Sequence, residues 1–305
     1  MFNLDLNEKT GLKSPRGYSR LIDYERAKTT LVKYTGLLSK QIAIFNGSYH
    51  ALEIIFGSYL KTGSILLLPV PTFPFYQKFE DSRHLKIKKI ACVGSADVLL
   101  IDKNLNSKIN ALYLVNPNNP LGYIFNLTNL TKLLKKAAAQ KILVVVDEAY
   151  YEFSGITSQS LLSRFSNLII VRTMSKAFGL PGIRIGYILA SPKIIMQLEI
   201  LKGPPYVINH YGLNLISQLR QKDFSQVKKY AVTINYSRVK LTKIFNQAGF
   251  KIYPSTANFI TIKIINSDKV TIDLAKKGIL VTNLNNYPDG GKLLKNHLRI
   301  TIPYC

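Results

Sequence analysis

Short segments that are continuously apolar most constrain how this chain can fold. They lie within KILVVVDEAY (141–150), NLIIVRT (167–173) and GYILAS (186–191). Strands buried on both faces lose the alternation of apolar and polar residues, and they occur in parallel sheets that helices cover on both sides. The preceding segment, LTNLTKLLKKAAAQ (127–140), has apolar residues at helical spacing. The sequence therefore predicts an α/β fold whose large domain has a mainly parallel sheet covered by helices.

Polar residues follow several of the predicted strands. Asn119 comes just after KINALYLVNP (108–117), Asp147 ends the next strand, and Lys176 follows the strand after that. Open parallel sheets bind ligands beyond the carboxyl ends of their strands. We therefore expect these three side chains to serve a ligand site at that edge of the sheet.

The pattern changes after about residue 225. A helix-like segment (230–250) is followed by short strand-like segments such as NFITIKI (258–264), which indicates a small α+β unit. A chain of 305 residues is long enough for two domains. We predict a large domain at 36–225 and a small domain formed by 1–35 and 226–305.

The chain is strongly basic, with 41 lysine and arginine residues against 17 aspartate and glutamate residues. A basic surface can bind nucleic acid. The basic residues are scattered over separate segments, however, and neither an RNA-binding aromatic cluster nor zinc-ligand spacing accompanies them. We expect a solvated basic surface, with no nucleic-acid partner and no metal site.

The sequence also bears on location. No apolar run approaches the roughly 18 residues that a membrane-spanning helix needs. The start MFNLDLNEKT contains Asp5 and Glu8 and lacks the apolar core of a secretory signal. Cys92 and Cys305 form no motif, which fits a reducing compartment. We expect a cytoplasmic protein that does not bind a membrane.

Four motifs occur in order along the α/β pattern, and their combination is more specific than any one of them. They are NPNNPLG (116–122), VVVDEAYYEF (144–153), SKAFGLPGIR (175–184) and LRIT (298–301). The chain resembles the fold type I, pyridoxal-phosphate-dependent aminotransferases of amino-acid biosynthesis, within them the branch of histidinol-phosphate aminotransferases and threonine-phosphate decarboxylases. The resemblance runs from Gly47 to Arg299, with a weaker trace in LDLNEKTG (4–11).

Lys176 stands between a serine and the run AFGLPG, which indicates buried or tightly turned backbone. Pyridoxal phosphate forms a Schiff base with an amine, usually that of a lysine in a dry pocket. The resemblance implies that Lys176 is this lysine and that its freed amine moves a proton during catalysis. The alternative is a half-buried structural lysine.

The resemblance also assigns residues to the cofactor ring. A carboxylate beside the ring nitrogen favours its protonated form by roughly 1–3 pKa units, and Asp147 matches that position. Asn119 and Tyr150 match the residues that hydrogen-bond the 3-oxygen. We expect Glu148 to point away or to cap the next segment, and we expect Asn118 to serve turn geometry.

Gly47-Ser48-Tyr49 opens a predicted helix after a strand, so its backbone N–H groups and the helix dipole favour an anion. The resemblance makes this anion the cofactor phosphate and adds Arg184, which can pair with it in bidentate fashion. Thr173 and Ser175 supply hydroxyl groups. For Ser48, an ordinary helix N-cap is the alternative.

Three further residues match family positions. Phe73 matches the aromatic residue that stacks on the ring, although a plain core phenylalanine is the alternative. Arg299 matches the arginine that binds a substrate carboxylate or phosphate, where Asn119 also contributes. Tyr34 resembles the tyrosine that reaches the cofactor phosphate of the partner subunit, which implies a homodimer with shared active sites.

The sequence departs from the family at Thr282, where phosphate-specific members often carry an arginine. We predict an aminotransferase that moves an amino group between an L-amino acid, with glutamate expected, and a 2-oxo or ketone acceptor. We also expect histidinol phosphate to be a poor substrate. One alternative is a decarboxylase of a phosphorylated amino acid, which uses the same lysine, aspartate and arginines. Another is a non-enzymatic cofactor-sensing or nucleic-acid-binding protein.

Overall fold

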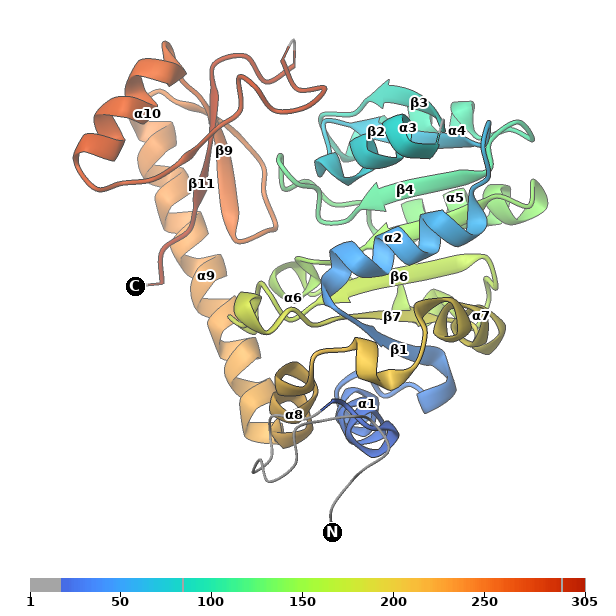
Figure 1. Ribbon diagram of the computed structural model, residues 1–305. Helices are drawn as coiled ribbons and strands as arrows, with labels where there is room; N and C mark the ends of the chain where they lie inside the picture. The colour runs from blue at the N-terminus through green and yellow to red at the C-terminus, as the bar shows by residue number, and fades with distance from the viewer. Residues whose placement is uncertain (1–17, 84, 292, 305) are drawn as a thin grey trace. The chain divides into compact units, whose positions relative to one another are not determined.

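The computed structural model of the chain describes residues 18–83, 85–291 and 293–304 (Figure 1). The LDLNEKTG motif (4–11), with Asp5 and Glu8, and Cys305 lie outside these residues. The predicted segment 1–35 is therefore described only from Tyr18 onward.

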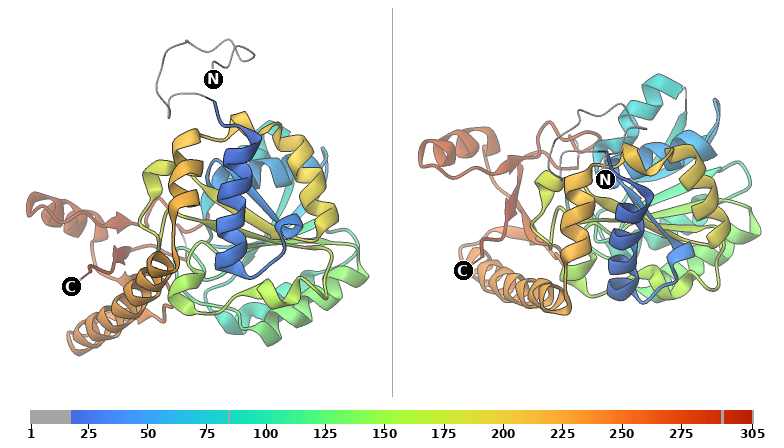
Figure 2. Two further views of the ribbon diagram at one scale, coloured as in Figure 1. Left: turned by 90° about the horizontal axis from the view of Figure 1, so that it is seen from below. Right: turned by 60° about the horizontal axis from the view of Figure 1, so that its bottom comes forward.

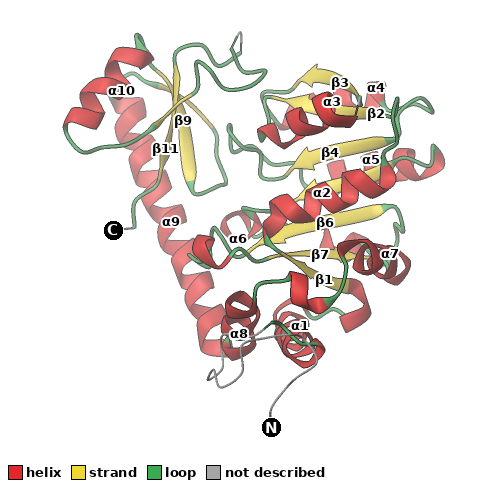
Figure 3. Cartoon of the chain, in the orientation of Figure 1, coloured by secondary structure: helices red, strands yellow, loops and turns green. Residues whose placement is uncertain are grey.

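Helices and strands alternate along most of the described chain (Figure 3). The described strands form a larger sheet in the order β1-β7-β6-β5-β4-β2-β3 and a smaller one in the order β10-β11-β9-β8. The strands of the larger sheet are β1 (Ile42–Phe45), β2 (Ile65–Val70), β3 (Lys86–Ala91), β4 (Ala111–Val115), β5 (Leu143–Asp147), β6 (Leu168–Thr173) and β7 (Gly186–Ala190). β2 pairs in parallel with β3 and β4, and β4 with β5, whereas β1 and β7 are antiparallel. The predicted α/β class is confirmed.

The chain divides into two compact units. The first contains the described part of Met1–Tyr59 together with Val171–Gln226, and the second contains Leu60–Ile170 together with the described part of Val227–Cys305. The predicted division into 36–225 and into 1–35 with 226–305 stays a prediction.

The described α-helices have the following bounds: α1 (Leu21–Thr35), α2 (Gly47–Tyr59), α3 (Gln77–Arg83), α4 (Val98–Asn104), α5 (Leu127–Ala139), α6 (Tyr151–Ser154), α7 (Pro192–Lys202), α8 (His210–Gln218), α9 (Gln221–Gln247) and α10 (Ser267–Lys276).

In the first unit, β1 and β7 are buried along their whole length, as their continuous apolar sequences require. Helices α1 and α8 lie side by side (Figure 2). Helix α1 ends at Gly36, which has a φ of 72° and accepts the left-handed conformation of a helix C-cap. Helix α7 begins with Pro192, whose fixed φ suits the first helical position.

In the second unit, β4 is buried at every position and β5 at every position after Leu143. Helix α5 begins after Asn126, whose side chain accepts a hydrogen bond from the backbone N–H of Asn129 at 2.9 Å. Its buried residues have the spacing of a single helical face: Leu130, Leu133, Leu134 and Ala137.

The smaller sheet also belongs to the second unit. Its strands are β8 (Lys251–Tyr253), β9 (Phe259–Lys263), β10 (Thr282–Asn283) and β11 (His297–Thr301). All of its pairings are antiparallel, and α10 lies between β9 and β10 in the sequence. These elements match the α+β pattern predicted for this part of the chain. Among the described helices, none combines the length and the apolar character needed to cross a bilayer.

Candidate active site

The predicted site residues fall into two sets, one in each compact unit. The first unit holds Tyr34, Gly47, Ser48, Tyr49, Thr173, Ser175, Lys176 and Arg184. The second unit holds Phe73, Asn119, Asp147, Tyr150 and Arg299.

An arginine lies against the start of α2 in the first unit. Gly47 begins this helix with a φ of 83°, and a Cβ atom at this position would lie only 2.6 Å from Nη2 of Arg184. A glycine is therefore required for the guanidinium to approach the helix N-terminus. Nη1 of Arg184 donates to the backbone oxygen of Pro181 at 3.0 Å. Helix N-terminal N–H groups and a guanidinium both attract anions, so this arrangement fits a phosphate group.

The turn after β6 carries Lys176. Thr173 is buried, and its hydroxyl donates to the Ser175 hydroxyl at 3.0 Å. The N–H of Gly179 donates to the oxygen of Lys176 at 3.0 Å, and Gly179 has a φ of 66°. The predicted tight turn is thus present. In the single chain, Lys176 is exposed and Ala177 beside it is buried.

Two tyrosines of the first unit differ in their surroundings. The ring of Tyr34 packs on Phe178 and Phe224, with centroids 5.2 Å and 4.8 Å away. Tyr34 therefore contacts the turn that carries Lys176. Tyr49 follows Ser48 on α2 and is 38% exposed. The role of Tyr34 across a dimer stays a prediction.

Asp147 ends β5 in the second unit and is buried. Its Oδ2 accepts a hydrogen bond from the hydroxyl of Tyr113 at 2.9 Å, and its Oδ1 accepts one from the N–H of Ala149 at 3.0 Å. Burial, followed by the charge of Asp147, raises the pKa of Tyr113 well above its usual value, so the tyrosine stays a donor. Sequence reasoning missed Tyr113, since a tyrosine inside the apolar strand β4 gives no local sign of its partner.

A hydrogen-bonded chain joins three of the predicted residues in the second unit. Nη1 of Arg299 donates to Oδ1 of Asn119, and Nδ2 of Asn119 donates to the Tyr150 hydroxyl at 3.4 Å. Burial raises the pKa of Tyr150 to about 12, while Arg299 lowers it and Asp147 raises it. Tyr150 therefore keeps its proton at any physiological pH. The guanidinium also lies over the ring of Phe259, 5.4 Å from its centroid.

Thr282 lies directly opposite Arg299, because β10 and β11 are paired at these residues. Nη2 of Arg299 donates to the Thr282 hydroxyl at 3.3 Å. The position that the sequence singled out as a departure from the family therefore contacts the predicted substrate arginine.

For three further side chains, the structure bears on the role that the sequence left open. Phe73 is half-buried, whereas its neighbours Phe75 and Tyr76 are fully buried, so a plain core role fits Phe73 less well. Glu148 accepts hydrogen bonds from the N–H of Ser158 at 2.6 Å and from its hydroxyl at 2.7 Å, which confirms that it caps the next segment. Asn118 accepts from the N–H of Leu121 at 3.0 Å and so serves the turn.

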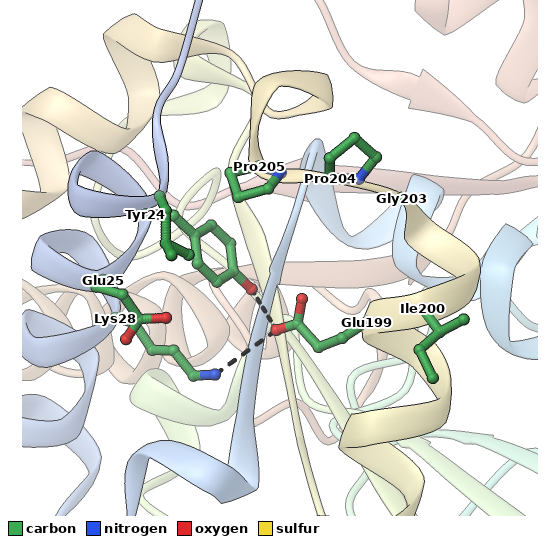
Figure 4. A pocket seen from close by; sticks show the side chains of 9 residues that line it. Tyr24, Glu25, Lys28, Glu199, Ile200, Gly203, Pro204 and Pro205 are labelled. Carbon is green, nitrogen blue, oxygen red and sulfur yellow. Dashed lines mark hydrogen bonds and ion pairs between the residues drawn. The ribbon is translucent and has the colours of Figure 1, made fainter.

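A separate cavity of about 460 Å³ lies in the first unit, between α1 and the end of α7 (Figure 4). Tyr24 donates to Glu199 at 2.5 Å, and Lys28 pairs with Glu199 at 3.6 Å. The buried Lys202 also pairs with Glu199, and its Nζ donates to the Tyr24 hydroxyl at 2.9 Å. None of the predicted site residues lines this cavity. Glu25 also lines the cavity, so two carboxylates balance the two lysines, which indicates a structural role.

Pyridoxal phosphate presents a phosphate, a pyridine nitrogen and an aldehyde to a protein. The first unit by itself offers an anion site and an amine, and the second unit by itself offers a buried carboxylate, so each unit carries residues of a kind that this cofactor needs. Together with the α/β fold, they define the class of pyridoxal-phosphate-dependent enzymes of fold type I.

Comparison with known proteins identifies the family within this class. The family model "Aminotransferase class I and II" matches residues 8–305. A histidinol-phosphate aminotransferase from Caldanaerobacter subterraneus subsp. tengcongensis is 33% identical over 287 residues, which cover 91% of this chain and 78% of that protein. The chain belongs to the class I and II aminotransferases, and it is a pyridoxal-phosphate-dependent aminotransferase.

Solved structures support the fold. The histidinol-phosphate aminotransferase from Clostridium acetobutylicum matches with a TM-score of 0.83 at 23% identity, covering 94% of this chain and 86% of that chain. The Sinorhizobium meliloti histidinol-phosphate aminotransferase in complex with pyridoxal-5'-phosphate has a TM-score of 0.74 at 20% identity, covering 94% of this chain and 78% of that chain.

Proposed function

We propose that the chain moves an amino group between L-glutamate and a 2-oxo acid or ketone, with Lys176 as the covalent attachment point of the cofactor. The observation that carries the proposal is the part-buried hydrogen bond from Arg299 to Asn119 in the second unit. It fixes one side of the guanidinium and presents a directed charge to a substrate carboxylate. The relatives are named as aminotransferases, which favours transfer over decarboxylation.

Bound pyridoxal phosphate supplies an electron sink that weakens the bonds to the substrate Cα. In the proposal, Nζ of Lys176 first holds the cofactor and then accepts and returns the Cα proton. The turn closed by Gly179 restricts the backbone of Lys176, and the exposed side chain is accessible to the cofactor.

Asp147 is proposed to keep the ring nitrogen protonated. Its burial removes competing water, and Tyr113 and Ala149 fix the positions of its two oxygens. Tyr150 and Asn119 are proposed to hydrogen-bond the 3-oxygen. Tyr150 is suited to donate there, because the raised pKa keeps its proton in place.

Arg184 and the start of α2 at Gly47 and Ser48 are proposed to bind the cofactor phosphate. This rests on the close approach of the guanidinium to Gly47. The hydroxyls of Thr173 and Ser175, which already form one hydrogen-bonded pair, are proposed to add donors. Tyr49 is proposed to contribute from α2, and Phe73 to stack on the ring.

A homodimer with shared active sites is also proposed, with Tyr34 reaching the phosphate bound by the partner subunit. The proposal follows the family resemblance, and the position of Tyr34 beside the turn that carries Lys176 supports it. We further propose a cytoplasmic location.

The reversible amino transfer can be followed through the absorbance of the bound cofactor. Adding glutamate should convert the spectrum to that of the aminated cofactor, and adding 2-oxoglutarate should restore it. Release of CO₂ from an amino acid, without this reversible change, would identify a decarboxylase instead. A spectrum that responds to neither compound would contradict the proposed donor.

A further inference from the structure

One tyrosine hydroxyl near the predicted substrate arginine is buried without a hydrogen-bond partner. It belongs to Tyr287, in the segment between β10 and β11, and no described residue donates to it or accepts from it. Burying a polar group without a partner lowers stability, and proteins retain few such groups. The hydroxyl is therefore a candidate for a ligand contact.

The segment that carries Tyr287 is held in place. The N–H of Tyr287 donates to the oxygen of Leu284 at 3.1 Å, and the N–H of Gly290 donates to the oxygen of Tyr287 at 2.8 Å. Farther along, the Asp289 carboxylate accepts from the Tyr76 hydroxyl and pairs with Lys89 at 3.3 Å. These contacts fix the turn, so the ring is positioned before any substrate arrives.

The surroundings of the hydroxyl are those of the predicted site. Burial raises the pKa of Tyr287, the positive charge of Arg299 lowers it, and Tyr150 raises it. The N–H of Leu284, whose oxygen accepts from Tyr287, donates to the oxygen of His297 at 2.9 Å, which holds the turn against β11, the strand that carries Arg299. Arg299 is bonded to Asn119 on one side and to Thr282 on the other. The unpartnered hydroxyl thus belongs to the same cluster as the hydrogen-bonded arginine.

We propose that the Tyr287 hydroxyl donates a hydrogen bond to the substrate oxyanion that Arg299 binds, and that it determines specificity at this position. The inference rests on the proposed role of Arg299. Arg299 contacts the neutral Thr282 hydroxyl, and the proposed second donor, Tyr287, is also neutral. One guanidinium with two neutral hydroxyls matches the single charge of a carboxylate better than the double charge of a phosphate.

The test is the variant Tyr287→Phe, which removes only the unpartnered oxygen. Succinate and inorganic phosphate are titrated separately into the cofactor-loaded protein and followed by calorimetry. The two titrations distinguish carboxylate binding from phosphate binding. Succinate should bind about ten- to a hundredfold more weakly to the variant. The thermal midpoint without succinate should not fall, because no protein hydrogen bond is lost. Tyr253→Phe, in β8 of the same sheet, serves as the matched control and should leave succinate binding unchanged.

Kinetics give a second measurement. The KM for glutamate should rise in Tyr287→Phe while kcat changes little, since the contact is present both before and during the reaction. Unchanged succinate binding in Tyr287→Phe, with weakened binding in Arg299→Gln, would overturn this inference and leave the proposed function intact. A lower thermal midpoint of Tyr287→Phe with an unchanged KM would also overturn the inference, because it would show that the hydroxyl has a structural role. A wild-type protein that neither binds succinate nor reacts with glutamate would contradict both.

Discussion

Asp147 and Tyr113 form the best-defined interaction of the candidate site at the residue scale. The carboxylate is buried, accepts a hydrogen bond from the tyrosine at 2.9 Å, and lies at the end of β5. Two fixed donors orient the carboxylate oxygens, which is what a partner of a protonated ring nitrogen requires.

Asp147→Asn should keep the fold and lose most of the turnover. An amide cannot hold the proton on the ring nitrogen, and a shift of 1–3 pKa units corresponds to roughly 1.4–4 kcal/mol. We expect kcat to fall about ten- to a thousandfold. Tyr113→Phe, which leaves the carboxylate in place, should cost less. Near-normal turnover in Asp147→Asn would show that another group protects the ring proton.

Thr282 carries the prediction on substrate choice. A neutral hydroxyl contacts Arg299 where a second guanidinium would strengthen phosphate binding by about 1–2 kcal/mol, or five- to thirtyfold. We therefore expect Thr282→Arg to raise kcat/KM for histidinol phosphate by about this factor relative to glutamate. Thr282→Val, which removes the hydroxyl without adding charge, should not. A wild-type kcat/KM for histidinol phosphate above that of every other donor would contradict this account, and the names of the relatives make this comparison necessary.

Sequence reasoning reached the site residues unevenly. Asp147, Asn119 and Arg299 were predicted as site residues because they belong to motifs whose order is specific. Tyr113 was missed because its hydrogen-bond partner, Asp147, lies 34 residues away in the sequence. Tyr287 was missed because it lies in a turn with no regular sequence pattern. The exposure of Lys176 could not be predicted, since the small residues after it indicate a turn but do not decide which side chains the turn encloses.

At the scale of elements, the buried strands β4 and β5 were predictable because their apolar sequences are continuous. Strand β3 was not, since KIKKIA has two adjacent lysines and therefore shows neither a continuous apolar run nor strict alternation. It lies at the end of the sheet order, beside β2. Charged side chains are common on such edge strands, where they hinder unwanted pairing. The antiparallel pairing of β1 with β7 was also unpredictable, because it joins segments far apart in the sequence.

Gly122, in the turn that follows β4, supports contacts within the second unit. It has a φ of 82°, its oxygen accepts from the N–H of Thr256 at 2.8 Å, and a Cβ there would lie 2.1 Å from the Ser255 hydroxyl. Gly122→Ala should therefore lower the free energy of unfolding by more than about 2 kcal/mol. The matched control is Gly249→Ala, with the same φ of 82° and no neighbour within 4 Å, which should cost only about 1–2 kcal/mol.

Chemical denaturation of both variants measures the difference between them. Equal losses of stability would show that only the backbone conformation matters at Gly122, and that the contact with Ser255 does not.

At the scale of the whole molecule, one buried thiol links stability to pH. Burial, and then the charge of Asp97, raises the pKa of Cys92 from its ordinary value of 9.0 to about 12. The unfolded chain therefore loses this proton first. The protonated Cys92 thiol therefore contributes fully to stability below about pH 9, and this contribution is lost as the pH rises toward 12.

Between about pH 8.5 and 10, the unfolding free energy of Cys92→Ala should therefore fall less steeply with pH than that of the wild-type protein. The two slopes should differ by at most about 1.4 kcal/mol per pH unit. Denaturant titrations at several pH values give this slope for both proteins. The buried tyrosines are common to both, so the difference isolates the thiol. Parallel slopes would mean that Cys92 ionises in the folded protein as it does in the unfolded one.

The most direct test of the account is a single half-reaction with ¹⁵N-labelled glutamate and no acceptor. We predict one equivalent of 2-oxoglutarate per cofactor, transfer of the label to the released cofactor and no CO₂, because the amino group moves while the Cα–carboxylate bond stays intact. Lys176→Ala should form no borohydride-reducible bond to the cofactor and should produce no 2-oxoglutarate. The absence of labelled cofactor with the wild-type protein, or reductive labelling of a lysine other than Lys176, would contradict the account.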